Sequence, residues 1–107
     1  MKLITKEIAK KAQAQFKHGS SLSNQQVVAK FFTPAAGWTW YLMNQDPDDT
    51  DYLWGIVKGF ELEMGSFSLS ELESVKLPGG LGVERDKFFK PMLAEEVWRK
   101  LQKGEHI

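Results

Sequence analysis

Apolar residues recur at every fourth position near the start of the chain. They are Ile4, Ile8, Ala12 and Phe16. This spacing places the four side chains on one face of a helix with 3.6 residues per turn. Thr5 offers an N-cap oxygen, and Gly19 can adopt the left-handed conformation in which many helices end. The pattern therefore predicts an amphipathic N-terminal helix, followed by a polar loop over residues 17–25.

β-Branched and aromatic residues dominate the next part of the chain, and four segments are typical of strands. These segments are residues 27–32, 38–43, 52–57 and 60–64. Pro34 and Gly37 supply turn chemistry between the first two segments. In residues 60–64 apolar and acidic positions alternate without exception, so one face of the sheet there is exposed to water. The pattern predicts an antiparallel four-stranded meander.

Two further helices follow the strands. Ser68 and Glu71 have the spacing of a capping box, which predicts a short helix over residues 69–74. Residues 81–90 contain two phenylalanines but show no clear period, so the pattern assigns them no structure. The last helix has Pro91 in its first turn and an apolar stripe along one face. The stripe is formed by Leu93, Val97 and Leu101.

Together these elements predict a single α+β domain over residues 1–107. We expect the N-terminal, short and C-terminal helices to pack on one face of the antiparallel four-stranded sheet.

The composition fits one soluble domain and excludes several classes of protein. The chain has 107 residues, of which 42% are hydrophobic and 26% are charged, and its formal net charge is zero. No overall field therefore attracts nucleic acid or an anionic membrane. Cysteine is absent, which excludes disulfides and thiolate chemistry. No apolar run is long enough for a membrane span, and the start is too polar for a signal peptide, so we expect a cytoplasmic protein.

Residues for catalysis or metal binding are scarce. His18 and His106 are the only histidines, and neither has a second histidine at metal-ligand spacing. The glycines of residues 79–82 lack the Lys-Ser/Thr of a phosphate-binding loop. The acidic run that begins at Asp46 does not match a calcium loop, which needs Gly at its sixth position and Glu at its twelfth. We therefore expect no catalytic residue, no metal and no cofactor.

Aromatic residues are the most distinctive feature of the chain. Four Trp, seven Phe and two Tyr make up 12% of the sequence. Trp38 and Trp40 share one face of their strand, and Trp54 lies on the next strand. One interpretation is that these rings form core and cross-strand pairs. The other is that they form an aromatic platform for a partner. The sequence leaves both interpretations open.

The charge is unevenly distributed along the chain. Residues 44–73 contain eight acidic residues and one lysine. Asp48, Asp49 and Asp51 are therefore candidates for a surface that docks a basic partner protein. The alternative is a nucleic-acid-binding accessory protein that uses a basic N-terminal helix. Its candidate residues are Lys2, Lys6, Lys10 and Lys11.

Several blocks of the sequence, taken together, resemble a known family. They are Lys-Phe-Phe-Thr-Pro at residues 30–34, Trp-Thr-Trp-Tyr at 38–41, Gly-Ser-Phe-Ser-Leu-Ser-Glu-Leu at 65–72 and Leu-Gly-Val-Glu-Arg-Asp at 81–86. The family is a small bacterial one of unknown function, carried by plasmids, phages and other mobile elements. The resemblance implies that setting, and association of similar domains with antirestriction modules suggests counter-defence. It implies no reaction.

The last of these blocks adds the candidate site Glu84, Arg85 and Asp86. These residues fit either a structural ion pair or helix cap, or a recognition site formed together with Trp38 and Trp40. A hydrolase built on Glu84 and Asp86 is a third hypothesis, which requires a pocket and one carboxyl group of raised pKa. Our leading expectation is a non-enzymatic domain that binds another protein.

Overall fold

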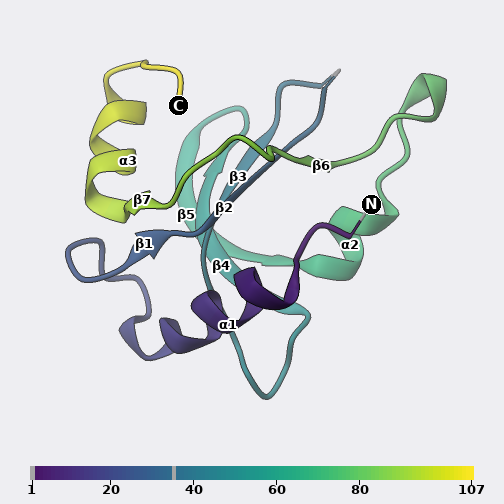
Figure 1. The fold of residues 1–107 in the computed structure, drawn as a ribbon. Helices are drawn as coiled ribbons and strands as arrows, with labels where there is room; N and C mark the ends of the chain where they lie inside the picture. Colours follow the sequence, from purple (N-terminus) through teal and green to yellow (C-terminus); the bar gives the residue numbers. More distant parts are fainter. Residues whose placement is uncertain (1, 35) are drawn as a thin grey trace.

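The centre of the protein is an antiparallel sheet of five strands. The computed structural model describes residues 2–34 and 36–107, and Figure 1 shows how the helices surround the sheet. The strands lie in the order β5-β4-β3-β2-β6. Their bounds are β2 Ala29–Phe32, β3 Thr39–Gln45, β4 Tyr52–Lys58, β5 Leu62–Ser68 and β6 Glu84–Arg85. The predicted α+β class and antiparallel sheet are confirmed, and the predicted number of four strands is wrong.

The fifth strand, β6, comes from the segment for which the sequence showed no period. Phe31 lies opposite Arg85 and Phe32 lies opposite Glu84, so β6 pairs with β2. A strand of two residues is too short to display an alternating pattern. Its pairing is set by a partner far away in the sequence. The turn predicted over residues 34–37 includes residue 35 and so lies partly outside the described residues.

The strand predicted over residues 27–32 is divided in two. Its first part, β1 (Gln26–Val27), leaves the main sheet and pairs with β7 (Met92–Leu93) in a separate two-stranded sheet. Because β7 is extended, the last helix begins only at Ala94, as α3 (Ala94–Gln102). The prediction that Pro91 lies in the first turn of this helix is therefore wrong.

The first two helices begin where their capping residues predict. The side chain of Thr5 accepts a hydrogen bond of 3.2 Å from the backbone N–H of Ile8 at the start of α1 (Lys6–Ala14). Ser68 accepts one of 3.3 Å from the N–H of Glu71 at the start of α2 (Leu69–Ser74). Two short 3₁₀ helices complete the elements, η1 (Phe16–His18) and η2 (Pro78–Gly80).

The helices cover both faces of the sheet, which corrects the expectation that they lie on one face. α1 and α2 pack over the face that carries Phe31 and Leu42, whereas α3 packs over the face that carries Tyr41 and Ile56. Figure 1 shows α1 and α3 on different sides of the strands. The reason lies in β3, where the successive residues Tyr41, Leu42 and Met43 are all buried. A strand that is apolar on both faces has to be covered on both.

β5 forms one edge of the sheet, and none of its residues is buried. β5 starts two residues later than predicted, at Leu62, so Phe60 and Glu61 belong to the preceding loop. Glu63 is exposed, as the alternating pattern predicts. Within residues 2–34 and 36–107, no helix has both the length and the apolar character needed to cross a membrane.

Candidate functional site

An open groove lies beside β5, on the face of the sheet that α1 and α2 cover elsewhere. It encloses about 410 Å³. We call it the aromatic groove, and its defining residues are Trp38, Trp40, Phe60, Glu61, Glu63 and Gly65. They come from the start of β3 and the residue just before it, from the β4–β5 loop and from β5. Two of the three tryptophans singled out in the sequence therefore line one concave surface.

Three of the aromatic rings that line the groove, those of Trp38, Trp40 and Phe60, pack in a cluster centred on Trp38. The ring centroids of Trp38 and Trp40 are 6.1 Å apart, and the planes differ by 25°. Phe60 meets Trp38 edge to face, with centroids 5.5 Å apart and planes at 80°. Both arrangements are favourable for aromatic pairs. Phe60 nevertheless remains 95% exposed, so the cluster presents a preformed apolar surface to solvent.

Two glycines shape the groove in opposite ways. A Cβ atom added at Gly59 would lie only 2.2 Å from Cζ3 of Trp38, so the absence of a side chain allows the indole to pack against the backbone. A Cβ atom added at Gly65 would have no neighbour within 4 Å. Gly59 thus positions the Trp38 ring, and Gly65 leaves a hollow in the surface of β5.

The polar part of the groove is acidic. Glu61 and Glu63 are both exposed, and the described residues that line the groove include no lysine or arginine. Aromatic faces and carboxylates both attract cations. The arrangement can therefore hold a cationic side chain with an apolar stem, which is the chemistry of lysine and arginine.

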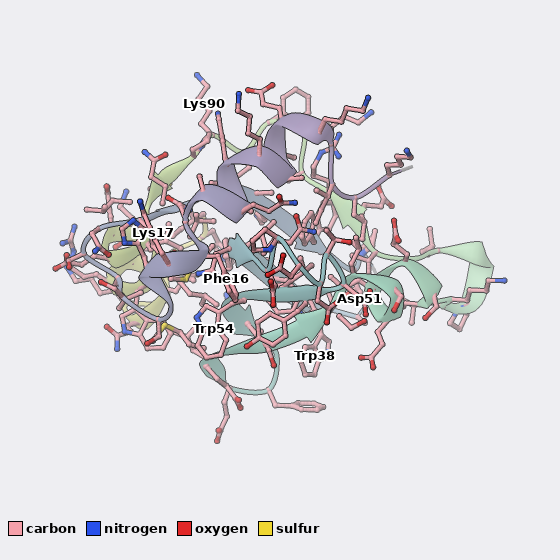
Figure 2. All side chains as sticks on the ribbon, turned by 90° about the horizontal axis from the view of Figure 1, so that it is seen from below. Phe16, Lys17, Trp38, Asp51, Trp54 and Lys90 are labelled. Carbon is pink, nitrogen blue, oxygen red and sulfur yellow. The ribbon has the colours of Figure 1, made fainter. Side chains whose placement is uncertain are left out.

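Trp54 does not belong to this surface. It packs with Tyr41 and Ile56 against the opposite face of the sheet. There it lines a separate cavity of about 300 Å³ together with Phe16 and Tyr52, and Figure 2 shows Trp54 and Phe16 near each other. Its indole N–H is buried and has no hydrogen-bond partner among the described residues. The three predicted tryptophans therefore do not form one platform.

Asp51 has a structural role in the described fold. One of its carboxylate oxygens accepts a hydrogen bond of 2.6 Å from the Ser68 hydroxyl, and the other accepts one of 2.7 Å from the N–H of Ser70. These bonds hold the acidic loop against the start of α2. The Ser68 hydroxyl and then the Ser70 N–H lower the pKa of Asp51 below its ordinary value.

Asp48 and Asp49 are exposed and Asp46 is half-buried, and two of these acids stabilise local turns. Asp46 accepts a 2.8 Å bond from the N–H of Asp48, and Asp49 accepts a 3.2 Å bond from the N–H of Asp51. Reversal of all three predicted docking acids would therefore disturb the loop and α2 as well as the surface charge. Asp48 is the most suitable of the three for a test of charge alone.

We expect the start of α2 to loosen in acid because of Asp51. Since its pKa is lowered in the folded state, its contribution to stability is complete above the ordinary value of 3.8 and is lost as the pH falls through the folded-state pKa. The amide resonance of Ser70, followed by NMR during an acid titration, should shift as Asp51 is protonated. Asp51→Asn should abolish this shift and Asp48→Asn should preserve it. An unchanged titration in Asp51→Asn would contradict this role.

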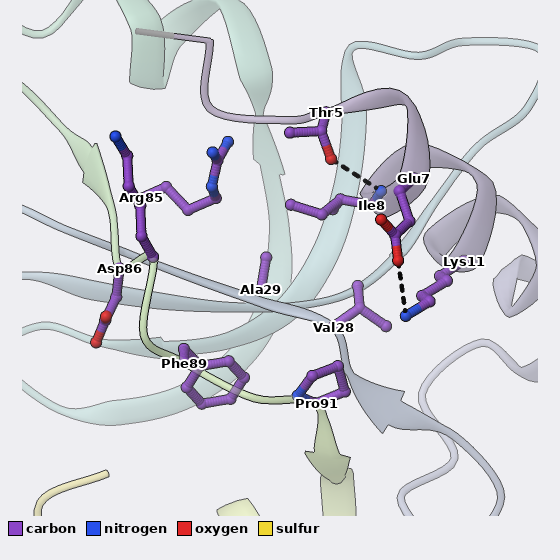
Figure 3. Close-up of a pocket in the computed structure, with 11 residues that line it drawn as sticks. Thr5, Glu7, Ile8, Lys11, Val28, Ala29, Arg85, Asp86, Phe89 and Pro91 are labelled. Atoms are coloured by element: carbon purple, nitrogen blue, oxygen red, sulfur yellow. Dashed lines mark hydrogen bonds and ion pairs between the residues drawn. The ribbon is translucent and has the colours of Figure 1, made fainter.

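The predicted residues Arg85 and Asp86 line a different groove of about 400 Å³, between α1 and β6. Figure 3 shows this groove. Arg85 Nη1 donates bonds of 2.8 and 3.0 Å to the carbonyl groups of Lys2 and Leu3. Asp86 lies 3.7 Å from the ammonium group of Lys30. These contacts hold the N-terminal segment and β2 to β6, which favours the structural interpretation.

Glu84 joins Arg85 and Asp86 in a further open cavity of about 320 Å³, which Phe32 and Phe88 also line. The Glu84, Arg85 and Asp86 cluster and the Trp38–Trp40 pair therefore line separate cavities. On α1, Lys6 and Lys10 are exposed, and Lys11 pairs with Glu7 at 3.5 Å, as Figure 3 also shows.

Sequence reasoning missed Phe60, Glu61, Glu63 and the two glycines as site residues. The alternating pattern of residues 60–64 predicts a strand that includes Phe60, and an aromatic residue in a strand is expected to pack against its neighbours. The predicted strand ends at residue 64, whereas β5 continues to Ser68 and includes Gly65. An isolated glycine inside a strand often marks a place where another backbone or a ligand approaches closely, and that signal becomes visible only when the strand is extended.

Among the described residues, no group of three or more His, Cys, Asp or Glu side chains is placed to hold a metal ion.

Comparison with known proteins gives a family but no activity. A search of curated proteins and a search of solved structures found no match. A family model described as "Protein of unknown function (DUF2958)" matches residues 3–105, nearly the whole chain. The resemblance to a family of unknown function is thus confirmed, and the chain belongs to the DUF2958 family.

Proposed function

We propose that this protein is a non-enzymatic protein-interaction domain and that the aromatic groove is its docking surface. The observation that carries the proposal is the ring cluster at the surface, in which Trp38 and Trp40 stack and Phe60 remains 95% exposed. Burial of large aromatic side chains at the centre of an interface supplies much of the binding energy of protein complexes. The rings already support one another, so little order has to be gained when a partner binds.

The charge of the groove favours a protein partner over nucleic acid. Glu61 and Glu63 lie beside the rings, whereas a site for stacked bases needs basic residues that contact the phosphates. We place this interaction in the bacterial cytoplasm and in the service of a mobile element, with counter-defence as the role that the sequence resemblance suggests.

Capture experiments with two exposed phenylalanines test the proposal. Phe60 lies in the aromatic groove, and Phe88, which is 92% exposed, lies outside it. Both can be replaced by alanine at little expected cost to stability because neither is buried. Phe60→Ala should reduce recovery of a stoichiometric partner from a host lysate by about tenfold or more, as for a central interface residue. Phe88→Ala should capture as much as the unchanged protein.

Quantitative mass spectrometry of the captured proteins provides the measurement. Equal losses with Phe60→Ala and Phe88→Ala would contradict the proposed surface, and so would capture that neither substitution affects. Circular dichroism of each variant establishes that the fold is intact.

A further inference from the structure

We propose that the aromatic groove and the adjoining edge of β5 bind an extended basic segment of a partner protein, which adds to the sheet as a further strand. This inference rests on the proposed function and specifies the chemistry of the partner. Lysine or arginine side chains of the added strand would lie in the groove, beside the rings and the two glutamates.

The edge of β5 can accept a strand. β5 is the outermost strand on its side of the sheet and has seven residues, Leu62–Ser68, all paired with β4. Among the described residues, no strand pairs with its other edge. The opposite edge of the sheet is β6, which has only two residues. An unpaired strand edge presents backbone N–H and C=O groups that an extended peptide can bond.

The register of β5 aligns this edge with the groove. Glu63, Gly65 and Phe67 are alternate residues, so they lie on the same face of the strand, the face that carries the groove. An added strand would place every second side chain on that face, about 6–7 Å apart. The side chain opposite Gly65 would enter the hollow that this glycine leaves. The next side chain on the same face of the added strand would lie opposite Glu63 and face its carboxylate.

The charge of the groove selects a basic occupant. Glu61 and Glu63 are exposed and belong to none of the ion pairs of the described residues. A lysine or arginine stem can pack on Trp38 and Phe60 while its charged end approaches the carboxylates. A second copy of this chain, joined through its own β5, would bring two more exposed glutamates to this edge and no basic residue, because β5 contains no lysine or arginine. The acidic edge therefore disfavours self-association and favours a basic strand.

Two synthetic peptides of the same length as β5, seven residues, provide the probe. One alternates lysine with valine, and its matched control alternates glutamate with valine. Each is titrated at low salt into the ¹⁵N-labelled full chain and followed by NMR. We expect the lysine peptide to shift the indole N–H resonances of Trp38 and Trp40 and the amide resonances of β5. The indole resonances of Trp54 and Trp98, which pack on the other face, should remain in place.

Substitutions separate the contributions of the hollow, the rings and the charge. Gly65→Val should weaken binding of the lysine peptide by about tenfold, because the new side chain fills the hollow. It should leave the fold intact, since the added Cβ meets no neighbour within 4 Å and valine favours strands. Phe60→Ala and Glu63→Gln should each weaken binding by about two- to fivefold, and Phe88→Ala should not. Salt should weaken binding because the charges are exposed.

Several results would overturn the inference. They are equal binding of the glutamate peptide, no shifts with the lysine peptide at the highest soluble concentration, and shifts confined to the acidic loop at residues 46–51. Shifts in β5 that depend on protein concentration alone would assign the edge to a second copy. If the lysine peptide fails but Phe60→Ala still abolishes capture of a partner, the proposed function stands and only the basic strand is excluded.

Discussion

Gly55→Ala is expected to lower the free energy of unfolding by about 3 kcal/mol or more, at the upper end of single-substitution effects. A Cβ atom at this position would lie 2.0 Å from the carbonyl oxygen of Tyr41 and 3.2 Å from Cα of Leu42. Both atoms belong to the backbone of β3, so no side-chain rotation can relieve the overlap. The register between β3 and β4 shifts directly after this point, between Leu42 and Asn44. The two strands would have to separate at the centre of the sheet.

Gly65→Ala is the matched control, because Gly65 lies directly opposite Gly55 in the β4–β5 pair. Its added Cβ meets nothing within 4 Å, so we expect a change of no more than about 0.5 kcal/mol, in either direction. Urea unfolding of both variants provides the measurement. Gly55→Ala should lower the midpoint urea concentration and leave the dependence of the unfolding free energy on urea unchanged. Similar midpoints for the two alanine variants would show that the close approach at Gly55 is unimportant.

The parts of the fold that sequence alone predicts are those determined by neighbouring residues. The caps at Thr5 and Ser68 act on N–H groups three residues further on, so their spacing is visible in the chain. β6 and β7 depend on partners far away in the sequence, β2 and β1. With only two residues each, they offer no period to detect.

The sequence does contain a signal that both faces of the main sheet are covered by helices. The consecutive residues Tyr41, Leu42 and Met43 are all apolar, and such a run is typical of a strand buried on both sides. The expectation of one covered face came instead from residues 60–64, where the alternation is clean. That pattern describes only β5, at the edge of the sheet, and not the central strands.

The candidate site shows the same limit. Alternation in one strand correctly places Trp38 and Trp40 together. The position of Trp54 on the opposite face depends on the register between β3 and β4. Trp40 lies opposite Val57, and Trp54 is an odd number of residues from Val57. In the sequence, nothing distinguishes Asp51 from the other acids of the loop. The hydrogen bond that it accepts comes from the N–H of Ser70, nineteen residues away.

Titration of Tyr41 is expected to destabilise the protein strongly in alkali. Burial raises the pKa of Tyr41 from its ordinary 10.0 to about 12, and the negative charge of Asp86 adds to the rise. Phe89 packs on the ring, with centroids 6.3 Å apart, and Lys30 holds Asp86 nearby, at 3.7 Å. Because the raised pKa favours the neutral phenol in the fold, the associated stability is complete below pH 10.0 and is lost as the pH rises toward about 12. The rise corresponds to about 3 kcal/mol.

Tyr41→Phe provides the test, since it retains the buried ring and removes the group that titrates. Urea unfolding at a series of pH values should show that the unchanged protein loses about 3 kcal/mol more than Tyr41→Phe between pH 10.0 and about 12. Tyr52→Phe is the control, because Tyr52 is 39% exposed. It should keep the alkaline loss of the unchanged protein. Ultraviolet absorbance should show a tyrosinate that forms near pH 12 in the unchanged protein and is missing from Tyr41→Phe. If Tyr41→Phe and the unchanged protein lose stability in parallel, the phenol is not the group that couples folding to alkaline pH.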